Sequence, residues 1–354
     1  MHTLDDPTTY SRLDPSGLLG RIRDLPRQCH RAWGQATATA FPPQYRQAGQ
    51  VVVLGMGGSA IGGDLLRDAV AHECPVPIRV LRDYALPADV GAGALVIASS
   101  YSGETEETLA SFQEAAKRGA HLAVVTGGGR LQAVARERSL PLLTIDYESE
   151  PRAVLGFSFF LLLGLLYQLG LVGDKSRELE EVGRVLEGLN SRLGPEVPLE
   201  RNPAKGLATA LQGRLAVVYG AGILEGAARR WKSQVNENAK AWAFFETFPE
   251  LDHNAVVGYD WPRDLADRIL VVLLYGDLVH PRTKNRYQIT REILERKGIG
   301  YRVVVSEGES ILSQMMSSVL TGDYVSYYLA VLNGVDPSPV AVISFLKERL
   351  KSID

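Results

Sequence analysis

The feature that most constrains the fold of this chain is a regular alternation between strand-like apolar runs and helix-like stretches. Such alternation is typical of a parallel sheet with helices on both faces. In the first half, strands are predicted at Val51–Leu54, Ile78–Leu81, Ala94–Ala98, Leu122–Val125 and Leu142–Ile145. Helices are predicted at Leu18–Trp33, Ile61–Ala71, Glu104–Lys117 and Leu131–Arg136. These elements predict one doubly wound α/β unit.

The second half repeats this pattern after a linker at Leu193–Pro203, where glycine and prolines interrupt helical periodicity. Strands are predicted at Leu215–Tyr219, Ile269–Leu274 and Arg302–Val305, and helices at Glu225–Ala241, Asn285–Lys297, Ser310–Asn333 and Val340–Lys351. Both halves open with a strand, a small-residue turn and a helix, VVVLGMGGSAIGGDLL and LAVVYGAGILEGAARR. The predicted fold class is α/β, with two doubly wound, flavodoxin-type parallel-sheet domains. The expected division is an N-terminal helical segment (1–45), a first domain (46–192) and a second domain (193–354).

Composition excludes several classes of protein. The 354 residues carry 38 Lys and Arg against 41 Asp and Glu, without a basic cluster, which argues against a nucleic-acid partner. Only two cysteines occur, Cys29 and Cys74, too few for a disulfide scaffold or a Cys-based zinc site. The polar, acidic start Met1–Asp14 is unlike a secretory signal peptide. We therefore expect a cytoplasmic protein with reduced thiols.

One stretch, Ala153–Val172, is uncharged and about as long as a membrane span. Its glycines, Ser158, Tyr167 and Gln168 lower its hydrophobicity, and it follows a strand of the regular α/β pattern. A helix that is apolar on all sides is also what a buried core requires. We predict a buried helix, placed at a dimer interface, and no membrane partner; a membrane helix is the alternative.

The first candidate ligand loop is Gly55-Met56-Gly57-Gly58-Ser59, between a predicted strand and a predicted helix. Glycines let the backbone approach an anion, and a helix start offers unpaired N–H donors. Gly57, Gly58 and the hydroxyl of Ser59 are therefore candidate phosphate ligands. A tight turn without a ligand explains the loop equally well. It also approximates a dinucleotide-binding fingerprint, in which Asp83 would hold a ribose.

The second loop, Ser99 to Thr105, follows the strand Ala94–Ala98 and leads into a helix. Ligands bind at the carboxyl ends of strands in a doubly wound sheet. The hydroxyls of Ser100, Ser102 and Thr105, together with helix-start amides, can hold a phosphate monoester without Lys or Arg. An N-capping loop would account for one of these hydroxyls. The two loops together favour a sugar phosphate over a dinucleotide.

At this point the sequence resembles a known family. GMGGSAIGGDLLRD and SSYSGETEET look like the sugar isomerase (SIS) domain, and NENAK followed by PELDHN resembles the bifunctional phosphoglucose/phosphomannose isomerases of archaea and bacteria. The resemblance runs from about Val51 to Lys347. It implies two SIS-like domains, a homodimer, and no metal or organic cofactor. It also implies that the hydroxyl-bearing loops hold the substrate phosphate.

Interconversion of an aldose and a ketose phosphate needs a base that carries a proton between C1 and C2, for which a carboxylate is suited. Glu237, flanked by Asn236 and Asn238, falls on the family's catalytic base. His253 lies 16 residues later, the spacing that the family shows (253 − 237 = 16). An imidazole can move protons near neutral pH, and we predict that it opens the sugar ring. By the resemblance, His253 reaches the active site of the neighbouring subunit.

An enediolate intermediate is anionic, and a fixed cation would stabilise it. Arg152 matches the family's active-site arginine, and Lys347 matches a C-terminal lysine beside the sugar ring; a solvated helix face explains Lys347 equally well. One position departs from the family. Seven residues before Lys347, relatives carry Thr or Gln, and here Val340 stands. Either Ser338 supplies the hydroxyl, the helix register differs, or the balance between glucose and mannose phosphates is altered.

We therefore predict a metal-independent, dimeric isomerase that interconverts glucose 6-phosphate and mannose 6-phosphate with fructose 6-phosphate. Two alternatives stay open. A non-catalytic sugar-phosphate sensor needs the serine loops but neither Glu237 nor His253. A nicotinamide-dependent oxidoreductase would use the loop at Gly55.

Overall fold

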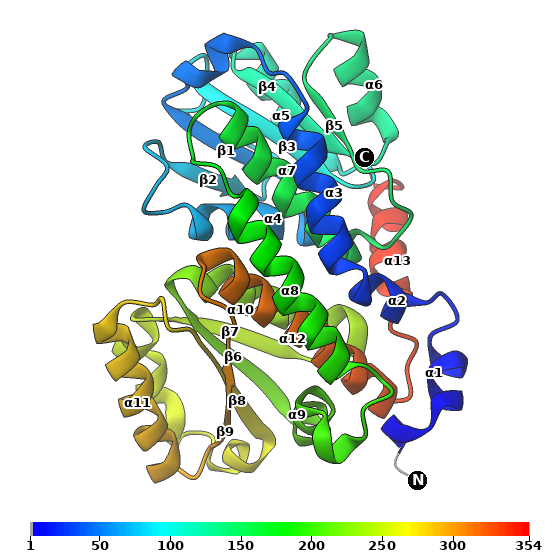
Figure 1. Cartoon of the computed structure of the whole chain (residues 1–354), viewed down its shortest axis with the longest axis vertical. Helices are drawn as coiled ribbons and strands as arrows, with labels where there is room; N and C mark the ends of the chain where they lie inside the picture. The colour runs from blue at the N-terminus through cyan, green and yellow to red at the C-terminus, as the bar shows by residue number, and fades with distance from the viewer. Residues whose placement is uncertain (1–2, 354) are drawn as a thin grey trace.

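Two parallel sheets organise the chain, whose computed structural model describes residues 3–353 (Figure 1). Sheet A contains β1 (Gln50–Leu54), β2 (Ile78–Leu81), β3 (Ala94–Ser100), β4 (His121–Thr126) and β5 (Leu142–Thr144), in the order β2-β1-β3-β4-β5. Sheet B contains β6 (Leu215–Ala221), β7 (Ala243–Phe248), β8 (Ile269–Tyr275) and β9 (Gly300–Val305), in the order β7-β6-β8-β9. All strand pairs are parallel. The predicted doubly wound α/β class is confirmed.

The helices of the first half cover sheet A. They are α1 (Pro7–Leu13), α2 (Leu18–Arg23), α3 (Leu25–Thr37), α4 (Gly57–Ala69), α5 (Glu106–Lys117), α6 (Gly129–Glu137) and α7 (Leu155–Gln168). Along β1, Val51 and Val53 pack with α3, α4 and α7, whereas Val52 and Leu54 pack with α5 and α6. Successive side chains of a strand point to opposite faces, so both faces of the sheet are buried.

The helix α8 (Ser176–Leu193) ends the first unit. The helices of the second half are α9 (Pro203–Leu211), α10 (Glu225–Ala239), α11 (Pro281–Arg296), α12 (Ile311–Leu332) and α13 (Ala341–Leu350). Figure 1 shows α4, α8, α10 and α12 between the two sheets, and α11 on the outer side of sheet B. In contrast, α13 has no buried residue. The two units therefore share one layer of helices. Glu237 lies on α10 of this layer, and Arg152 lies in a 3-10 helix beside it.

The apolar stretch after Pro151 forms α7, which is buried within the chain itself. A Cβ on Gly156 would lie 2.5 Å from Cβ of Gln28, and one on Gly164 would lie 2.5 Å from Cβ of Ala36, both on α3. On the other side, Gly62 of α4 approaches the backbone of Ser158 equally closely. The expected burial of this helix at a dimer interface was wrong, because these glycines let α3 and α4 enclose it. No helix within residues 3–353 is both long and apolar enough to cross a membrane.

Four further elements differ from the sequence-based expectation. The helix predicted over Leu18–Trp33 is two helices, α2 and α3, separated at Asp24, with a proline in the first turn of α3. The helices α8 and α9 and the strand β7 were not predicted. β7 is an edge strand whose side chains alternate between buried and exposed, so it lacks the continuous apolar run of the central strands.

Candidate active site

The two candidate phosphate loops meet at the carboxyl ends of β1 and β3. The hydroxyl oxygen of Ser59 accepts a hydrogen bond from the backbone N–H of Tyr101 (3.2 Å), and Ser99 Oγ donates to the carbonyl of Ser59 (3.3 Å). A Cβ on Gly55 would lie 2.8 Å from the carbonyl oxygen of Ser99. Only glycine lets the two loops approach so closely. The structure therefore brings Ser59 together with the serine-rich loop, as predicted.

The serine-rich loop is folded around its own hydroxyl groups. Ser100 Oγ lies 2.9 Å from Thr105 Oγ1 and accepts from the N–H of Gly103 (3.2 Å). Ser102 Oγ accepts from the N–H of Glu104 (3.2 Å). Gly103 has a φ of +66°, and a Cβ there would overlap the carbonyl of Gly128. This glycine fixes the turn that gathers the three hydroxyls.

Both helices that follow these loops begin without a side-chain cap from any of the described residues. The residues that precede the helices are Met56 before α4 and Thr105 before α5, and neither side chain bonds the first turn of its helix. The first N–H groups of a helix need an acceptor, and they carry the positive end of the helix dipole. Two such ends beside four hydroxyls form a site suited to a phosphate group.

Arg152 lies next to these loops, in a short 3-10 helix over Pro151–Ala153. A Cβ on Gly58 would lie 2.8 Å from the carbonyl oxygen of Pro151 and 2.9 Å from Cα of Arg152. The start of α4 therefore rests directly on the backbone of Arg152. The guanidinium is 2% exposed. Its Nη2 donates to the carbonyls of Pro337 (2.7 Å) and Ser338 (2.9 Å).

Glu237 lies near the end of α10 and faces Arg152. Its Oε2 is 3.7 Å from Arg152 Nη1, and a quarter of its side chain is exposed. Burial lowers the pKa of Arg152, and the charge of Glu237 opposes that shift. A carboxylate thus stands beside a fixed guanidinium, next to the phosphate loops. The predicted constellation of Glu237, Arg152 and the loops is assembled within one chain.

His253 is not part of this assembly within the chain. It is exposed and ends a 3-10 helix (Glu250–His253) that follows the carboxyl end of β7, whereas Glu237 lies just before the start of β7. The six residues of β7 lie between them, and a strand of that length spans roughly 20 Å. Asp252 holds the segment against α11, where it accepts from Arg286 (2.9 Å) and Thr290 (3.0 Å). In one chain, His253 and Glu237 therefore flank opposite ends of β7.

Lys347 is exposed on α13. Ile343 precedes it by four residues on the same face of the helix, and Val340 is the residue at which the chain enters α13. Val340 and Ile343 line a cavity of about 1010 Å³ that also borders Glu237 and Trp242. The departure at Val340 therefore lies beside the catalytic candidate. Ser338 is engaged elsewhere, because its hydroxyl bonds that of Ser16.

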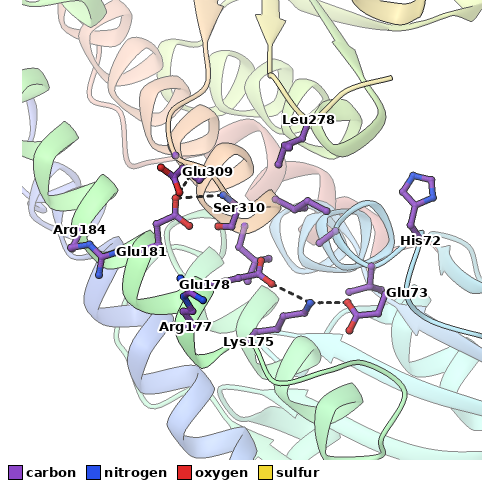
Figure 2. A pocket seen from close by; sticks show the side chains of 15 residues that line it. His72, Glu73, Lys175, Arg177, Glu178, Glu181, Arg184, Leu278, Glu309 and Ser310 are labelled. Carbon is purple, nitrogen blue, oxygen red and sulfur yellow. Dashed lines mark hydrogen bonds and ion pairs between the residues drawn. The ribbon is translucent and has the colours of Figure 1, made fainter. Parts of the chain in front are cut away.

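A second cavity, of about 800 Å³, lies at the start of α12, between residues of α4, α8 and α12, and is lined by none of the predicted residues. Figure 2 shows its charged lining: Lys175 bridges Glu73 and Glu178, and Glu181 reaches the start of α12 at Ser310. Lys175, Glu73 and Glu178 are paired with one another, and Glu181 already occupies the start of α12, so this helix start is not free as those of α4 and α5 are.

Comparison with known proteins agrees with this geometry. Residues 200–350 match the family model of the bacterial phospho-glucose isomerase C-terminal SIS domain. A bifunctional phosphoglucose/phosphomannose isomerase of Caldicellulosiruptor bescii is 41% identical over 94% of this chain and 98% of that protein. The chain belongs to the bifunctional phosphoglucose/phosphomannose isomerase family. The resemblance seen in the motifs is confirmed.

A second member of this isomerase family, from Aquifex aeolicus, is 36% identical over 85% of this chain and 90% of that protein. A solved structure of a glucose-6-phosphate isomerase like protein from Thermus thermophilus has a TM-score of 0.66 and 24% identity. It covers 97% of this chain and 100% of that chain, and supports the fold.

Within this isomerase family member, the amides around Glu237 have roles that the sequence did not indicate. Asn238 accepts from Arg152 Nε (2.6 Å), and Asn236 donates to the carbonyl of Ala241 (2.8 Å), where it closes the end of α10. Asn238 therefore contacts Arg152, the cation that faces Glu237. Asp83 caps its own turn, since its carboxylate accepts from the N–H of Tyr84 (2.6 Å).

Proposed function

We propose that this chain interconverts glucose 6-phosphate and mannose 6-phosphate with fructose 6-phosphate. One observation carries the proposal: a carboxylate, Glu237, faces the buried guanidinium of Arg152 at 3.7 Å, next to two uncapped, hydroxyl-lined helix starts. The names of the relatives point to the same reaction. The two cysteines are free thiols, which is consistent with a cytoplasmic enzyme.

The phosphate of the substrate binds at the carboxyl edge of sheet A. Its oxygens accept from the hydroxyls of Ser59, Ser100, Ser102 and Thr105, and from the N–H groups at the start of α4, where Gly57 and Gly58 allow close approach. Neutral donors and two helix dipoles hold the dianion. This leaves Arg152 available for charge that develops during the reaction.

Glu237 acts as the base on the open-chain sugar. For an aldose, its carboxylate removes the proton from C2; the electrons of that C–H bond form the C1–C2 double bond, and the carbonyl oxygen O1 becomes negative. The hydroxyl proton on O2 passes to O1, which moves the negative charge of the enediolate to O2. The protonated Glu237 then returns its proton to C1, and the electrons on O2 form the carbonyl at C2. Arg152 stabilises the enediolate electrostatically, because its charge is fixed and most of its hydrogen bonds are already made. Binding and proton transfer involve protein groups alone in this proposal, without a metal or organic cofactor.

His253 opens the sugar ring from a partner subunit in a homodimer. Support comes from its exposed position at the far end of β7 and from the apolar surface around Glu237. Trp242 is 78% exposed and Phe244 50%, both at the edge strand, and α13 exposes Val342 and Phe345. Exposed apolar patches of this kind mark protein contacts. A second copy that covers this surface would bring an imidazole to each active site.

Lys347 lies beside the sugar ring in this proposal, on the helix that the chain enters at Val340. A valine there offers no hydroxyl or amide to hold a water molecule, in contrast to the polar residue that the family resemblance implies. We therefore expect mannose 6-phosphate to be converted more slowly, relative to glucose 6-phosphate, than in relatives with a polar residue. Replacing Val340 by Thr should raise the rate with mannose 6-phosphate and leave the rate with glucose 6-phosphate unchanged, which a coupled assay with each sugar phosphate measures. The same assay in the presence of a chelator tests whether the reaction needs a metal.

A mixed-dimer experiment tests the proposal. Glu237→Gln and His253→Ala chains are each expected to be nearly inactive as pure homodimers. When unfolded together and refolded at equal amounts, they should regain about one quarter of the wild-type rate, because about half of the dimers are mixed and each mixed dimer holds one complete site. Each variant refolded alone is the control. If the mixture stays as inactive as its parents, His253 does not act across subunits.

A further inference from the structure

We propose that Asn238 is a positioning residue: held by Ser326, it fixes the guanidinium of Arg152 in front of Glu237. The inference rests on the proposed roles of Arg152 and Glu237. It concerns residues that touch neither the phosphate loops nor the reacting carbon atoms. Asn238 and Ser326 are both fully buried.

Arg152 has three nitrogen groups, and two of them are held by the protein. Nε donates to Asn238 Oδ1 (2.6 Å), and Nη2 donates to the carbonyls of Pro337 and Ser338. The remaining nitrogen, Nη1, faces Glu237. The two carbonyls hold the guanidinium at Nη2, and Asn238 holds it at Nε, the nitrogen that joins the group to the rest of the side chain. Without Asn238, the plane of the guanidinium would be free to turn about the Nη2 contacts.

The amide of Asn238 is itself oriented by a directional contact. Ser326 Oγ donates its only hydrogen to the carbonyl of Asp323 (2.9 Å), so it must accept from the neighbouring amide. Asn238 Nδ2 donates to this oxygen (3.0 Å). The NH₂ group therefore points to Ser326, and Oδ1 points to Arg152. This chain of contacts selects the one amide orientation that can hold a cation.

The same face of α10 also holds the backbone of Arg152. Arg230, Gln234 and Asn238 follow one another at intervals of four residues, so they form one stripe that faces α12. Arg230 Nη2 donates to the carbonyl of Arg152 (3.0 Å) and pairs with Asp323 (2.7 Å), and Gln234 donates to Asp323 (2.9 Å). This buried stripe ties Arg152 to α12 at both its main chain and its side chain.

The geometry has a consequence for catalysis rather than for binding. Glu237 is the residue before Asn238, so the last turn of α10 positions both the catalytic base and the amide that holds Arg152. Small displacements of catalytic groups cost up to about 100-fold in rate. Because the phosphate loops lie on other elements, their affinity for substrate should be unaffected.

A double-mutant cycle tests the inference. Asn238→Ala should lower kcat by about 10- to 100-fold and leave KM for glucose 6-phosphate within about threefold. Ser326→Ala should act in the same direction with a smaller loss of kcat. In an Arg152→Ala background, whose kcat is already low, adding Asn238→Ala should cause no further loss, since residues that act as a unit are not additive.

Asn202→Ala is the matched control. This asparagine is equally buried, and its Oδ1 accepts from the N–H groups of Ala204 (3.0 Å) and Lys205 (3.1 Å) at the start of α9, away from Arg152. Its loss should lower the melting temperature and leave kcat unchanged. Thermal unfolding of every variant separates instability from loss of positioning. If Asn238→Ala does not fold, Ser326→Ala replaces it in the double-mutant cycle with Arg152→Ala.

The outcomes separate the inference from the proposed function. If Arg152→Ala is impaired and the second substitution lowers kcat by its full single-mutant factor, the positioning role is wrong and the proposed function stands. If Arg152→Ala keeps the wild-type kcat, the proposed role of Arg152 and the inference fail together. A kcat within twofold of wild type for both Asn238→Ala and Ser326→Ala also overturns the inference.

Discussion

The carboxyl edges of the two sheets treat their helix starts differently. At sheet A, α4 and α5 begin without a side-chain cap from the described residues. At sheet B, carboxylates of the first unit occupy the starts of α10 and α12, and the side chain of His280 caps α11. Asp68 of α4 accepts from the N–H of Gly226 at the start of α10 (2.7 Å). Glu181 of α8 accepts from the backbone at the start of α12 and from Ser313 Oγ (3.0 Å).

This difference shows how one architecture serves two purposes. A helix start is an anion site by virtue of its free N–H groups and dipole. In sheet B the chain supplies the anions itself, and each one joins the second unit to the first. In sheet A the starts of α4 and α5 stay available for the phosphate of a substrate, whereas Glu104 accepts from the N–H of Arg130 at the start of α6 (2.7 Å). Changes at sheet A should therefore alter catalysis, and changes at the carboxylates of sheet B should alter stability.

The largest effect on kcat is expected at Glu237, which α10 of the second unit places beside the phosphate loops of the first unit. Glu237→Gln keeps the shape of the side chain but removes the base, so kcat should fall by about 100- to 10,000-fold. KM should change little, because the phosphate loops are intact. Steady-state assays in both directions measure this, and a kcat within about tenfold of wild type would be too high for the loss of a general base.

An intermediate effect is expected at the phosphate loops. Ser100→Ala and Ser102→Ala each remove a hydroxyl donor to a charged group, a contact that contributes about 1.5–3 kcal/mol. The KM for glucose 6-phosphate and the inhibition constant of inorganic phosphate should both rise, by about 10- to 100-fold, for each substitution. Ser111→Ala, which removes a buried hydroxyl of α5 bonded to the carbonyl of Asp83, serves as the control. Unchanged phosphate inhibition in both loop variants would place the phosphate elsewhere.

The loops and the alternating elements were predictable because their signals are local. A strand, a run of glycine or serine and a helix follow one another within a few residues, and the observed β1 and β3 lie within a few residues of the predicted strands. The apolar periodicity of α8 was equally visible, with Leu179, Val182, Leu186 and Leu189 on one face, and should have predicted that helix.

The rest depends on contacts between distant parts of the chain. Arg152 and Asn238 are 86 residues apart, and nothing in the neighbourhood of either shows that one holds the other. The same is true of α7, whose burial depends on close packing against Gln28 and Ala36. The edge strand β7 exposes Phe244, so its pattern differs from that of a buried strand. Local periodicity predicts elements, whereas these pairings arise from packing.

The smallest effect is expected at sheet B. Glu181→Gln keeps an acceptor at the start of α12 but removes the charge, and should cost about 1 kcal/mol of unfolding free energy near neutral pH, with kcat and KM unchanged. Partial burial raises the pKa of Glu181, but hydrogen bonds from Glu309, Ser310 and Ser313 outweigh it, so the pKa lies below the ordinary 4.5.

The sign of the pH dependence follows from this lowered pKa. The stabilisation is fully present above the ordinary pKa and is lost as the pH falls through the lower value of the folded state, where the carboxylate becomes protonated. Urea unfolding of wild type and Glu181→Gln should therefore give free energies that differ near neutral pH and converge in acid. A difference that stays constant down to acid pH would mean that the charge of Glu181 does not stabilise α12. A fall in the kcat of Glu181→Gln at neutral pH would mean that the carboxyl edge of sheet B also affects catalysis.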